Sequence, residues 1–237
     1  MLNEDSIRAA LKKRNIERGF LFLDSAESTN TMLKERTEPE GFFIAAAEQT
    51  AGRGRLQREF VSPKGGIYFS ILTKNENLSF LPFVAVCAVC EAVFELTGIS
   101  AVVKWVNDIF VGGRKLCGIL VQSTHGTGFS IVGIGVNVNS ALPDHLNAAT
   151  LYGYGVDECE LLAEIIFRFE TLLKKDCKEV LEDYKKRLFI LGREVEVIKV
   201  NERFIAQVVG LDEHGALIVE RNGETECLIS GDISLKI

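Results

Sequence analysis

The sequence predicts an α+β fold in which helices flank a mixed, largely antiparallel sheet, followed by a small C-terminal β-barrel. Apolar runs with strand character are joined by tight glycine turns, which connect antiparallel strands. Other runs carry apolar residues at helical spacing and predict helices between the strands. After Gly192 the chain has short strands with turn signals about every 8–12 residues, a pattern typical of a small barrel.

Length, charge and cysteine content narrow the class of protein. The 237 residues allow one large domain or one domain with a small appendage, and 47% hydrophobic with 25% charged residues exclude general disorder. A net charge of −6 excludes a nucleic-acid footprint over the whole surface. There is no signal-peptide pattern, and the longest apolar stretch, residues 80–90, is too short to cross a bilayer. Six scattered cysteines form no disulfide framework, so we expect a cytoplasmic protein without membrane association.

Short helices and strands alternate in the first third of the chain. Asn3–Arg14 has early capping residues and apolar positions at helical spacing. Ser28 offers a cap to a second short helix that carries Met32 and Leu33. Apolar strands are expected at residues 20–23, 42–47 and 67–72, and a polar segment rich in glycine and arginine separates the last two.

The middle of the chain predicts a long helix and a set of hairpins. The helix covers residues 79–96, with Pro82 tolerated in its first turn. Gly112–Gly113 is a two-residue turn that requires positive φ at both positions, and another hairpin passes through Gly126–Gly128. The expected strands are residues 101–105, 108–111, 114–122 and 129–138, and two helices follow at residues 158–173 and 177–188.

The character of the chain changes near Leu191–Gly192. The strands expected after this point are residues 195–200, 206–211, 216–219 and 225–229. We therefore divide the chain into a larger domain, residues 1–190, and a small C-terminal domain, residues 191–237.

Residues 49–66 form the most unusual segment, with three arginines and one lysine against a single glutamate. Glycines let a backbone approach a ligand closely, and guanidinium groups form planar forks that suit phosphate and carboxylate oxygens. The spacing matches neither a P-loop nor a dinucleotide-binding glycine motif. We favour anion binding over a solvated surface loop, because three arginines among glycines are unusual in a simple turn.

Three further segments allow both a chemical and a structural reading. Lys104–Asp108 holds the only tryptophan and two residues that could orient a polar ligand, yet a buried ring followed by an Asn-Asp turn explains the same pattern. Lys115 opens an apolar strand, where it could be a point charge in a dry pocket or simply solvated. Glycines alternate with apolar residues in Gly133–Asn139, which indicates close packing on the glycine face.

The cysteine pair and the histidines are better explained without a ligand. Cys87 and Cys90 have C-x-x-C spacing, but they fall in the middle of an apolar helix and no second pair accompanies them. We therefore expect them to pack in the core rather than to form a redox or zinc site. No metal-ligand spacing links His125, His145 and His214.

Taken in order, these motifs resemble those of biotin protein ligases, also called biotin–[acetyl-CoA-carboxylase] ligases. The matching residues are Ser28–Asn30, Gln49, Gly52–Arg55, Arg58, Ser62–Pro63, Gly65, Lys104–Trp105, Asn107–Asp108, Gly113–Leu116, Gly118–Leu120 and Gly133–Asn137. The tail, Gly215–Leu217 and Gly231–Leu235, is similar to the SH3-like barrel of the family. The resemblance covers nearly the whole chain and implies a fold like that of class II aminoacyl-tRNA synthetases and biotin ligases.

The resemblance implies a two-step reaction. The carboxylate of biotin attacks the α-phosphorus of ATP to give biotinyl-5′-adenylate and pyrophosphate. A lysine amine of a biotin carboxyl carrier protein, such as that of acetyl-CoA carboxylase, then captures the biotinyl group. The cofactors would be ATP and Mg²⁺, the metal held largely through the ATP phosphates with no certain protein ligand.

Site residues carry over from the family by position. The resemblance assigns catalytic roles to Lys115, Arg53 and Arg55. Biotin would contact Ser28, Thr29, Asn30, Gln49, Gly52, Arg53, Lys115, Gly118, Gly133 and Gly135. ATP and the adenylate would contact Arg53, Arg55, Arg58, Trp105, Asn107, Lys115 and Asn137.

The chain departs from the family pattern at a few positions. Leu56–Gln57 stands where many members have Arg-Gly, which removes one charge and one hinge from the arginine loop. Val106 replaces a proline, and Phe60 replaces a tryptophan. Only 27 residues precede Ser28, too few for the winged helix-turn-helix of some members, so we expect the form without a DNA-binding domain and no nucleic-acid partner. The family analogy also allows a homodimer.

Two other functions are compatible with parts of the sequence. A lipoate ligase or octanoyltransferase shares the fold, but Gly52–Arg55 together with Lys104–Trp105 favours biotin. A non-catalytic binding module would have no need of both Arg53 and Lys115, which are suited to a phosphoryl group undergoing transfer.

Overall fold

The structure is a computed structural model that describes residues 2–74, 77–124, 128–199, 202–229 and 232–235. Its helices are α1 (Glu4–Lys13), α2 (Thr29–Lys34), the 3₁₀ turn η1 (Arg55–Gln57), α3 (Leu81–Thr97), α4 (Glu158–Leu172) and α5 (Cys177–Arg187). Its strands are β1 (Phe20–Leu23), β2 (Phe43–Ala46), β3 (Ile67–Lys74), β4 (Val102–Lys104), β5 (Asp108–Val111), β6 (Arg114–Ser123), β7 (Phe129–Val136), β8 (Glu194–Ile198), β9 (Arg203–Leu211), β10 (Leu217–Arg221), β11 (Glu224–Leu228) and β12 (Asp232–Leu235).

Seven of these strands form the central sheet, in the order β1-β2-β3-β7-β6-β5-β4. Strands β1 and β2 are parallel, and the other neighbouring pairs of this sheet are antiparallel. The register places Gly133 opposite Ser70 and also opposite Leu120, and it places Gly135 opposite Gly118. On one face of the sheet, the middle of β7 therefore has no side chains, and Ser70 and Gly118 are among its neighbours on the adjacent strands.

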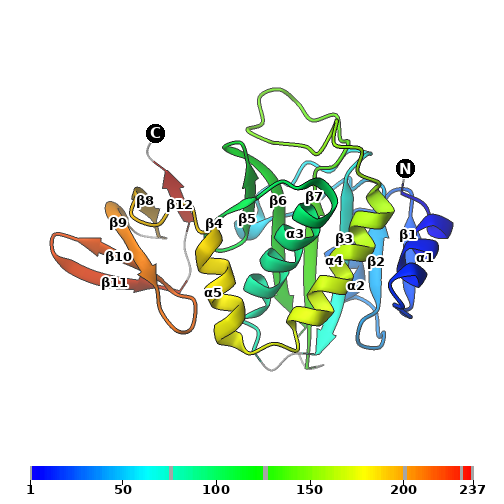
Figure 1. The fold of residues 1–237 in the computed structure, drawn as a ribbon, viewed down its shortest axis with the longest axis horizontal. Helices are drawn as coiled ribbons and strands as arrows, with labels where there is room; N and C mark the ends of the chain where they lie inside the picture. The colour runs from blue at the N-terminus through cyan, green and yellow to red at the C-terminus, as the bar shows by residue number, and fades with distance from the viewer. Residues whose placement is uncertain (1, 75–76, 125–127, 200–201, 230–231, 236–237) are drawn as a thin grey trace.

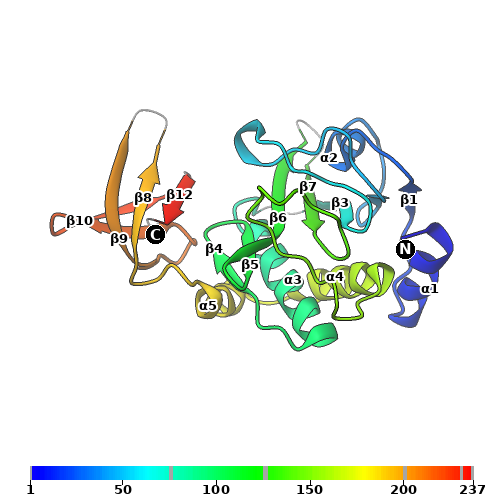
Figure 2. The same ribbon diagram turned by 90° about the horizontal axis from the view of Figure 1, so that it is seen from above.

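The two faces of the sheet are covered differently (Figures 1 and 2). Helix α3 packs on β5, β6 and β7, and α4 and α5 pack against α3, so that these helices cover one face of the sheet. This side holds the main core, which includes the fully buried rings of Phe43 and Tyr184. On the opposite face, α2 packs on β2, β3 and β7 above a small apolar cluster of Leu33, Ile44, Leu72 and Ile131. The segment that follows β2 crosses this second face.

A second, five-stranded antiparallel sheet lies beyond β4 and α5, in the order β11-β10-β9-β8-β12 (Figure 1). Its inward side chains, among them Val195 and Val208, join the main core. The predicted small β-unit is therefore present. The domain boundary that we proposed at residue 190 falls between α5 and β8.

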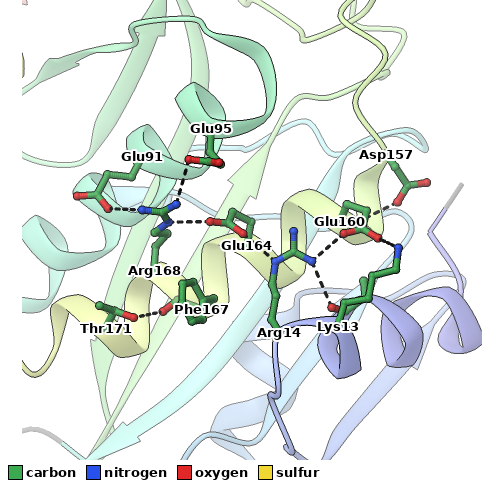
Figure 3. A network of polar contacts seen from close by, with 11 residues as sticks. Lys13, Arg14, Glu91, Glu95, Asp157, Glu160, Glu164, Phe167, Arg168 and Thr171 are labelled. Atoms are coloured by element: carbon green, nitrogen blue, oxygen red, sulfur yellow. Dashed lines mark hydrogen bonds and ion pairs between the residues drawn. The ribbon is translucent and has the colours of Figure 1, made fainter.

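A cluster of charged side chains fixes α1 to α4 (Figure 3). Arg14 donates to Glu164 and Glu160, with N–O distances of 2.7 Å to each, and Lys13 also pairs with Glu160. Arg168 donates to Glu164 at 2.7 Å and extends the cluster to two glutamates of α3. Hydrogen bonds from Lys13 and then Arg14 lower the pKa of Glu160. Burial acts to raise the pKa of Glu164, but its hydrogen bonds to Arg14 and Arg168 outweigh this and lower it.

Most of the expected elements are present within one to three residues of the expected bounds. Asn3 and Ser28 cap α1 and α2 as predicted, and Gly112 and Gly113 both have positive φ, of 57° and 74°. The last strand, β12, was not expected as a strand. Several residues of the expected elements and motifs lie outside the described residues: His125, Gly126, Thr127, Val200 and Gly231. Of the helices that are described, none is both long and apolar enough to cross a membrane.

Candidate functional site

A cavity of about 150 Å³ opens on the sheet face that carries α2, between that helix, the segment after β2 and the middle of β6 and β7. It brings together most of the residues predicted from sequence: Ser28, Thr29, Asn30, Gln49, Arg53, Arg55, Arg58, Asn107, Lys115, Gly118, Gly133 and Gly135. Residues from five separate segments thus meet in one place.

Uncharged polar groups form one end of this main cavity. Gln49 accepts through Oε1 from the backbone N–H of Thr29 (2.9 Å) and from its hydroxyl (3.2 Å), and its Nε2 donates to Ser62 (3.0 Å). The amide of Asn30 donates to Gln122 at 2.9 Å. Each amide is therefore held in a fixed orientation, which a site that recognises neutral hydrogen-bonding groups requires.

Ser70 was missed by the sequence analysis. Its Oγ lies 2.7 Å from Oγ1 of Thr29 and 2.6 Å from Oδ1 of Asn30, and the side chain is fully buried. The signal was present, because Ser70 is the one serine in the largely apolar run of residues 67–72. Ser70 links the start of α2 to β3 and so fixes the polar end of the cavity.

The floor of the cavity is glycine, and the ring of Phe60 lies on it. A Cβ at Gly135 would stand 2.4 Å from Phe60 Cε1, and one at Gly118 would stand 3.0 Å from Cε2. A Cβ at Gly133 would lie 2.0 Å from Oδ1 of Asn30. The expected close packing on the glycine face is therefore present, and Phe60 is a cavity residue that takes part in it.

One ammonium group lies at the other end of the cavity. Nζ of Lys115 is 2.7 Å from Oδ1 of Asp108 and 5.8 Å from the centre of the Phe60 ring. The two side chains keep about a third and a quarter of their surface exposed, so the pair is accessible from the cavity. Asp108 begins β5 and Lys115 lies near the start of β6, the strand paired with β5.

The three arginines sit on a tightly closed loop. The N–H of Gly54 donates to the carbonyl of Arg58 at 2.7 Å, and that of Phe60 donates to Gly52 at 2.9 Å. Leu56 and Gln57 at the tip have φ of 53° and 61°, the left-handed conformation in which glycine is favoured. Many family members have a glycine at position 57. This chain has Gln57 there, although the backbone takes the left-handed conformation that glycine adopts most easily.

Arg55 connects this loop to the turn that follows β4. Its Nη1 donates to Oδ1 of Asn107 at 3.3 Å, and Nδ2 of Asn107 donates to the carbonyl of Ile119 at 2.8 Å. Asn107 thus joins the arginine loop to β6. Its position depends on the backbone of the turn that carries it.

Gly52, Trp105 and Asn137 lie outside the lining of the main cavity. Gly52 packs beneath the loop, where a Cβ would lie 2.5 Å from the carbonyl oxygen of Phe60. Asn137 lines a second cavity of about 170 Å³ with Leu142, Leu146, Asn147 and Ala148, and Lys115 lines it too. Trp105 lines a third cavity of about 380 Å³ between the two sheets, together with Arg55 and Asn107.

None of the six cysteines lines the main cavity. Cys117 lies beneath it, but burial raises the pKa of its thiol well above the usual range. Cys87 and Cys90 are buried in α3 as predicted, and burial raises the pKa of Cys90 to about 12. The charged residues that line the cavity are Lys115, Asp108 and those of the arginine loop: Arg53, Arg55, Arg58 and Glu59.

Comparison with known proteins assigns a family to this arrangement. The model of the biotin/lipoate A/B protein ligase family matches residues 22–139, and that of the biotin protein ligase C-terminal domain matches residues 190–236. The chain is similar to a biotin protein ligase from Aquifex aeolicus solved in complex with biotin and ATP, with a TM-score of 0.84 and 34% identity over 92% of this chain and 98% of that chain.

Two further similarities agree. A biotin protein ligase from Leishmania major, solved in complex with biotinyl-5-AMP, has a TM-score of 0.63 and 25% identity over 89% of this chain and 98% of that chain. A biotin–[acetyl-CoA-carboxylase] ligase from Mycobacterium tuberculosis is 25% identical, over 98% of each chain.

Proposed function

The chain belongs to the biotin protein ligase family, and we propose that it activates biotin with ATP at the cavity around Lys115 and then transfers the biotinyl group to a lysine of a carrier protein. Relatives solved with biotin, ATP and biotinyl-5-AMP support both the substrates and the intermediate. The free cysteines suit a reducing compartment, and we place the reaction in the cytoplasm.

One observation carries the proposal: Lys115 lines two cavities at once. The main cavity ends in neutral donors and acceptors, which suit the ureido ring of biotin. The second is walled by Leu142, Leu146 and Ala148, which suit the flat face of a purine. An ammonium group between them would meet the biotin carboxylate from one side and the α-phosphate from the other.

The first step follows from this placement. The biotin carboxylate attacks the α-phosphorus, the bond to the pyrophosphate oxygen breaks, and pyrophosphate leaves with the electron pair. Two anions must approach each other, so a fixed cation lowers the barrier by offsetting their repulsion and the charge that builds on the phosphoryl oxygens. We assign this role to Lys115, with Arg53, Arg55 and Arg58 around the phosphates.

The polar end would bind the ureido group through Thr29 and Gln49, backed by Ser28 and Asn30. Glycines 118, 133 and 135 would let the bicyclic ring lie against the sheet, which requires the ring of Phe60 to shift from its place on Gly135. In its new position Phe60 would cover the bound ring.

ATP would enter as its magnesium complex. Within the described ranges, no three His, Cys, Asp or Glu side chains converge as a metal site, so the phosphates would supply most of the ligands. Asn137 lines this second cavity, and its Oδ1, which is buried and has no hydrogen-bond partner among the residues described, would be a neutral oxygen for the metal or its water shell. Bound Mg²⁺ would withdraw charge from the phosphates.

In the second step, the carrier lysine amine attacks the acyl carbon of the adenylate. The acyl–phosphate bond breaks, AMP leaves, the amine loses a proton and an amide forms. The name of the Mycobacterium tuberculosis relative points to acetyl-CoA carboxylase as the source of the carrier. The loop around Arg53 would retain the adenylate until that lysine arrives.

The test is exchange of labelled pyrophosphate into ATP, run with biotin, lipoate and octanoate in parallel. We expect exchange with biotin alone, followed by transfer of labelled biotin to the carrier domain and not to a carrier in which the acceptor lysine is replaced by arginine. Exchange with lipoate in place of biotin would make the chain a lipoate ligase. No exchange with any of the acids would leave only a binding module.

A further inference from the structure

A buried hydrogen bond joins the turn between β9 and β10 of the C-terminal sheet to the turn that carries Asn107 and Asp108. Nε1 of Trp105 donates to the carbonyl of Gly215 at 3.0 Å, and the tryptophan is 4% exposed. A donor buried to this degree needs a partner, since an unpaired indole N–H loses its hydrogen bond to water. Trp105 belongs to the turn after β4, and Gly215 belongs to the turn between β9 and β10.

The turn that offers this carbonyl is held in a defined shape. Oδ1 of Asp212 accepts from the backbone N–H of His214 (2.9 Å) and from that of Ala216 (2.8 Å). Gly215 has a φ of +83°, and a Cβ there would lie 2.3 Å from Cζ of Phe83 in α3. Only glycine lets the turn sit directly on α3 while its carbonyl points at the indole.

A second set of contacts, made in the core, holds the turn after β4 that carries Trp105. The ring of Phe83 meets that of Tyr184 edge to face, with centroids 4.8 Å apart. Oη of Tyr184 donates to the carbonyl of Val106 at 3.1 Å. The side chain of Trp105 and the backbone of Val106 are therefore both fixed, one by the C-terminal sheet and the other by α5.

The next two residues of the chain are site residues. Asn107 accepts from Arg55 and donates to β6, and Asp108 pairs with Lys115 at 2.7 Å. Trp105 and Asp108 are only three residues apart. A displacement of the indole would therefore move the backbone that carries the side chains of Asn107 and Asp108. The third cavity, which runs between the sheets, contains Trp105, Gly215, Asn107 and Arg55 on its walls.

We propose that Trp105 and Gly215 are positioning residues for the ligase reaction, through which the C-terminal sheet sets the places of Asn107 and Asp108 and thereby of Arg55 and Lys115. This inference rests on the roles proposed above for Arg55 and Lys115. It gives the C-terminal sheet a part in adenylate formation, although the groups that would bind the ureido ring of biotin lie elsewhere, on α2 and the segment after β2.

The placement predicts a split between kinetic constants. Trp105→Phe keeps an aromatic ring and removes the donor, so kcat of pyrophosphate exchange falls about tenfold, the worth of one hydrogen bond, while KM for biotin changes less than about twofold. Trp105→His retains a ring N–H and restores part of the loss. A structural role alone would lower the melting temperature and leave kcat per folded molecule unchanged.

Two glycines of the C-terminal sheet provide a matched pair. Gly215 and Gly223 have nearly equal φ, of +83° and +82°, so alanine brings the same backbone strain to each. A Cβ at Gly223 has nothing within 4 Å, whereas one at Gly215 meets Phe83. We expect Gly215→Ala to reduce kcat and Gly223→Ala to leave it unchanged.

The outcomes separate clearly. Loss of kcat in Trp105→Phe and Gly215→Ala, with Gly223→Ala normal, supports the proposal. Unchanged kcat in the first two, or an equal loss in both glycine variants, overturns it. If Trp105→Phe does not fold, the glycine pair still decides. Absence of biotin-dependent exchange in the unaltered protein would instead contradict the proposed function, so the two failures are distinguishable.

Discussion

Lys115 and Asp108 form an ion pair across neighbouring strands, with 2.7 Å between Nζ and Oδ1, at the wall that separates two cavities. The carboxylate keeps the ammonium in place while no substrate is bound. In the proposed reaction, the biotin carboxylate and the α-phosphate would replace Asp108 as partners of Lys115, and the cation would need no further displacement. The pair would then orient a charge in advance, which is how electrostatic catalysis avoids reorganisation during the reaction.

Replacement of Lys115 tests this role directly. We expect Lys115→Ala to reduce biotin-dependent pyrophosphate exchange about 10²–10³-fold, because the charge that offsets the two anions is removed. Lys12→Ala on the exposed side of α1 is the control and should be normal. Circular dichroism should show the same fold for both variants. Near-normal turnover in Lys115→Ala would remove Lys115 from the mechanism.

The arginine loop should control release of the intermediate. Arg53 is exposed and lines the main cavity, and the loop that carries it is closed by short backbone hydrogen bonds. Arg53→Gly should release biotinyl-5′-AMP roughly tenfold faster, because a charge-assisted contact to the phosphate is lost. The readout is biotin on lysines of an added bystander protein. Arg36→Gly, in an exposed pair with Glu38, should cause no such labelling.

The glycine floor of the main cavity leaves no space for a larger side chain at Gly133. A Cβ at Gly133 would lie 2.0 Å from Oδ1 of Asn30, which is itself held by Ser70 and Gln122. Gly133→Ala should lower the free energy of unfolding by about 1–3 kcal/mol and weaken biotin binding, since the buried amide must move. Gly210→Ala in β9, where nothing lies within 4 Å, should change neither. Urea unfolding and calorimetric titration with biotin measure the two effects.

The ion pairs between α1 and α4 should make stability sensitive to acid. The pKa values of Glu160 and Glu164 are lowered in the folded state, so the unfolded chain binds more protons below the ordinary glutamate value of about 4.3. Their contribution is complete above that pH and is lost as the pH falls through the lowered pKa values. Arg14→Met should flatten this decline, which urea unfolding between pH 7 and pH 3 would show.

The same variant should cost stability at neutral pH. The side chains of Arg14 and Glu164 are only 15% and 9% exposed, so removal of the cation leaves a carboxylate largely out of water. We expect a loss of about 1–3 kcal/mol, between the values for surface and buried pairs. Arg8→Met breaks a pair exposed by 63% and 58% and should cost less than about 0.5 kcal/mol. Equal losses in the two variants would contradict a special role for this cluster.

Local patterns were sufficient for much of the fold and for the charged part of the site. Capping residues located α1 and α2, and the Gly112–Gly113 turn located the β5–β6 hairpin that presents Lys115. The arginine loop was visible because its composition differs from that of the rest of the chain. Each of these features depends on residues close together in sequence.

The features that escaped depend on contacts between distant segments. Ser70 is a single serine in a largely apolar strand, and only the packing of α2 on β3 gives it two partners. The indole of Trp105 was expected to contact ATP and the adenylate, and its pairing with a carbonyl 110 residues away could not be predicted from its neighbours in the sequence. The parallel pairing of β1 with β2 likewise has no local signature.

The attachment of α1 has a consequence for synthesis of the chain. Arg14 finds its carboxylate partners 146 and 150 residues further along, whereas β1 pairs with a strand that follows it closely. On the ribosome, α1 therefore waits for α4, with its apolar positions Ile7, Ala10 and Leu11 uncovered and Arg14 without its glutamate partners. Helix α1 is made well before its partner and docks late, after the strands of the central sheet have been made.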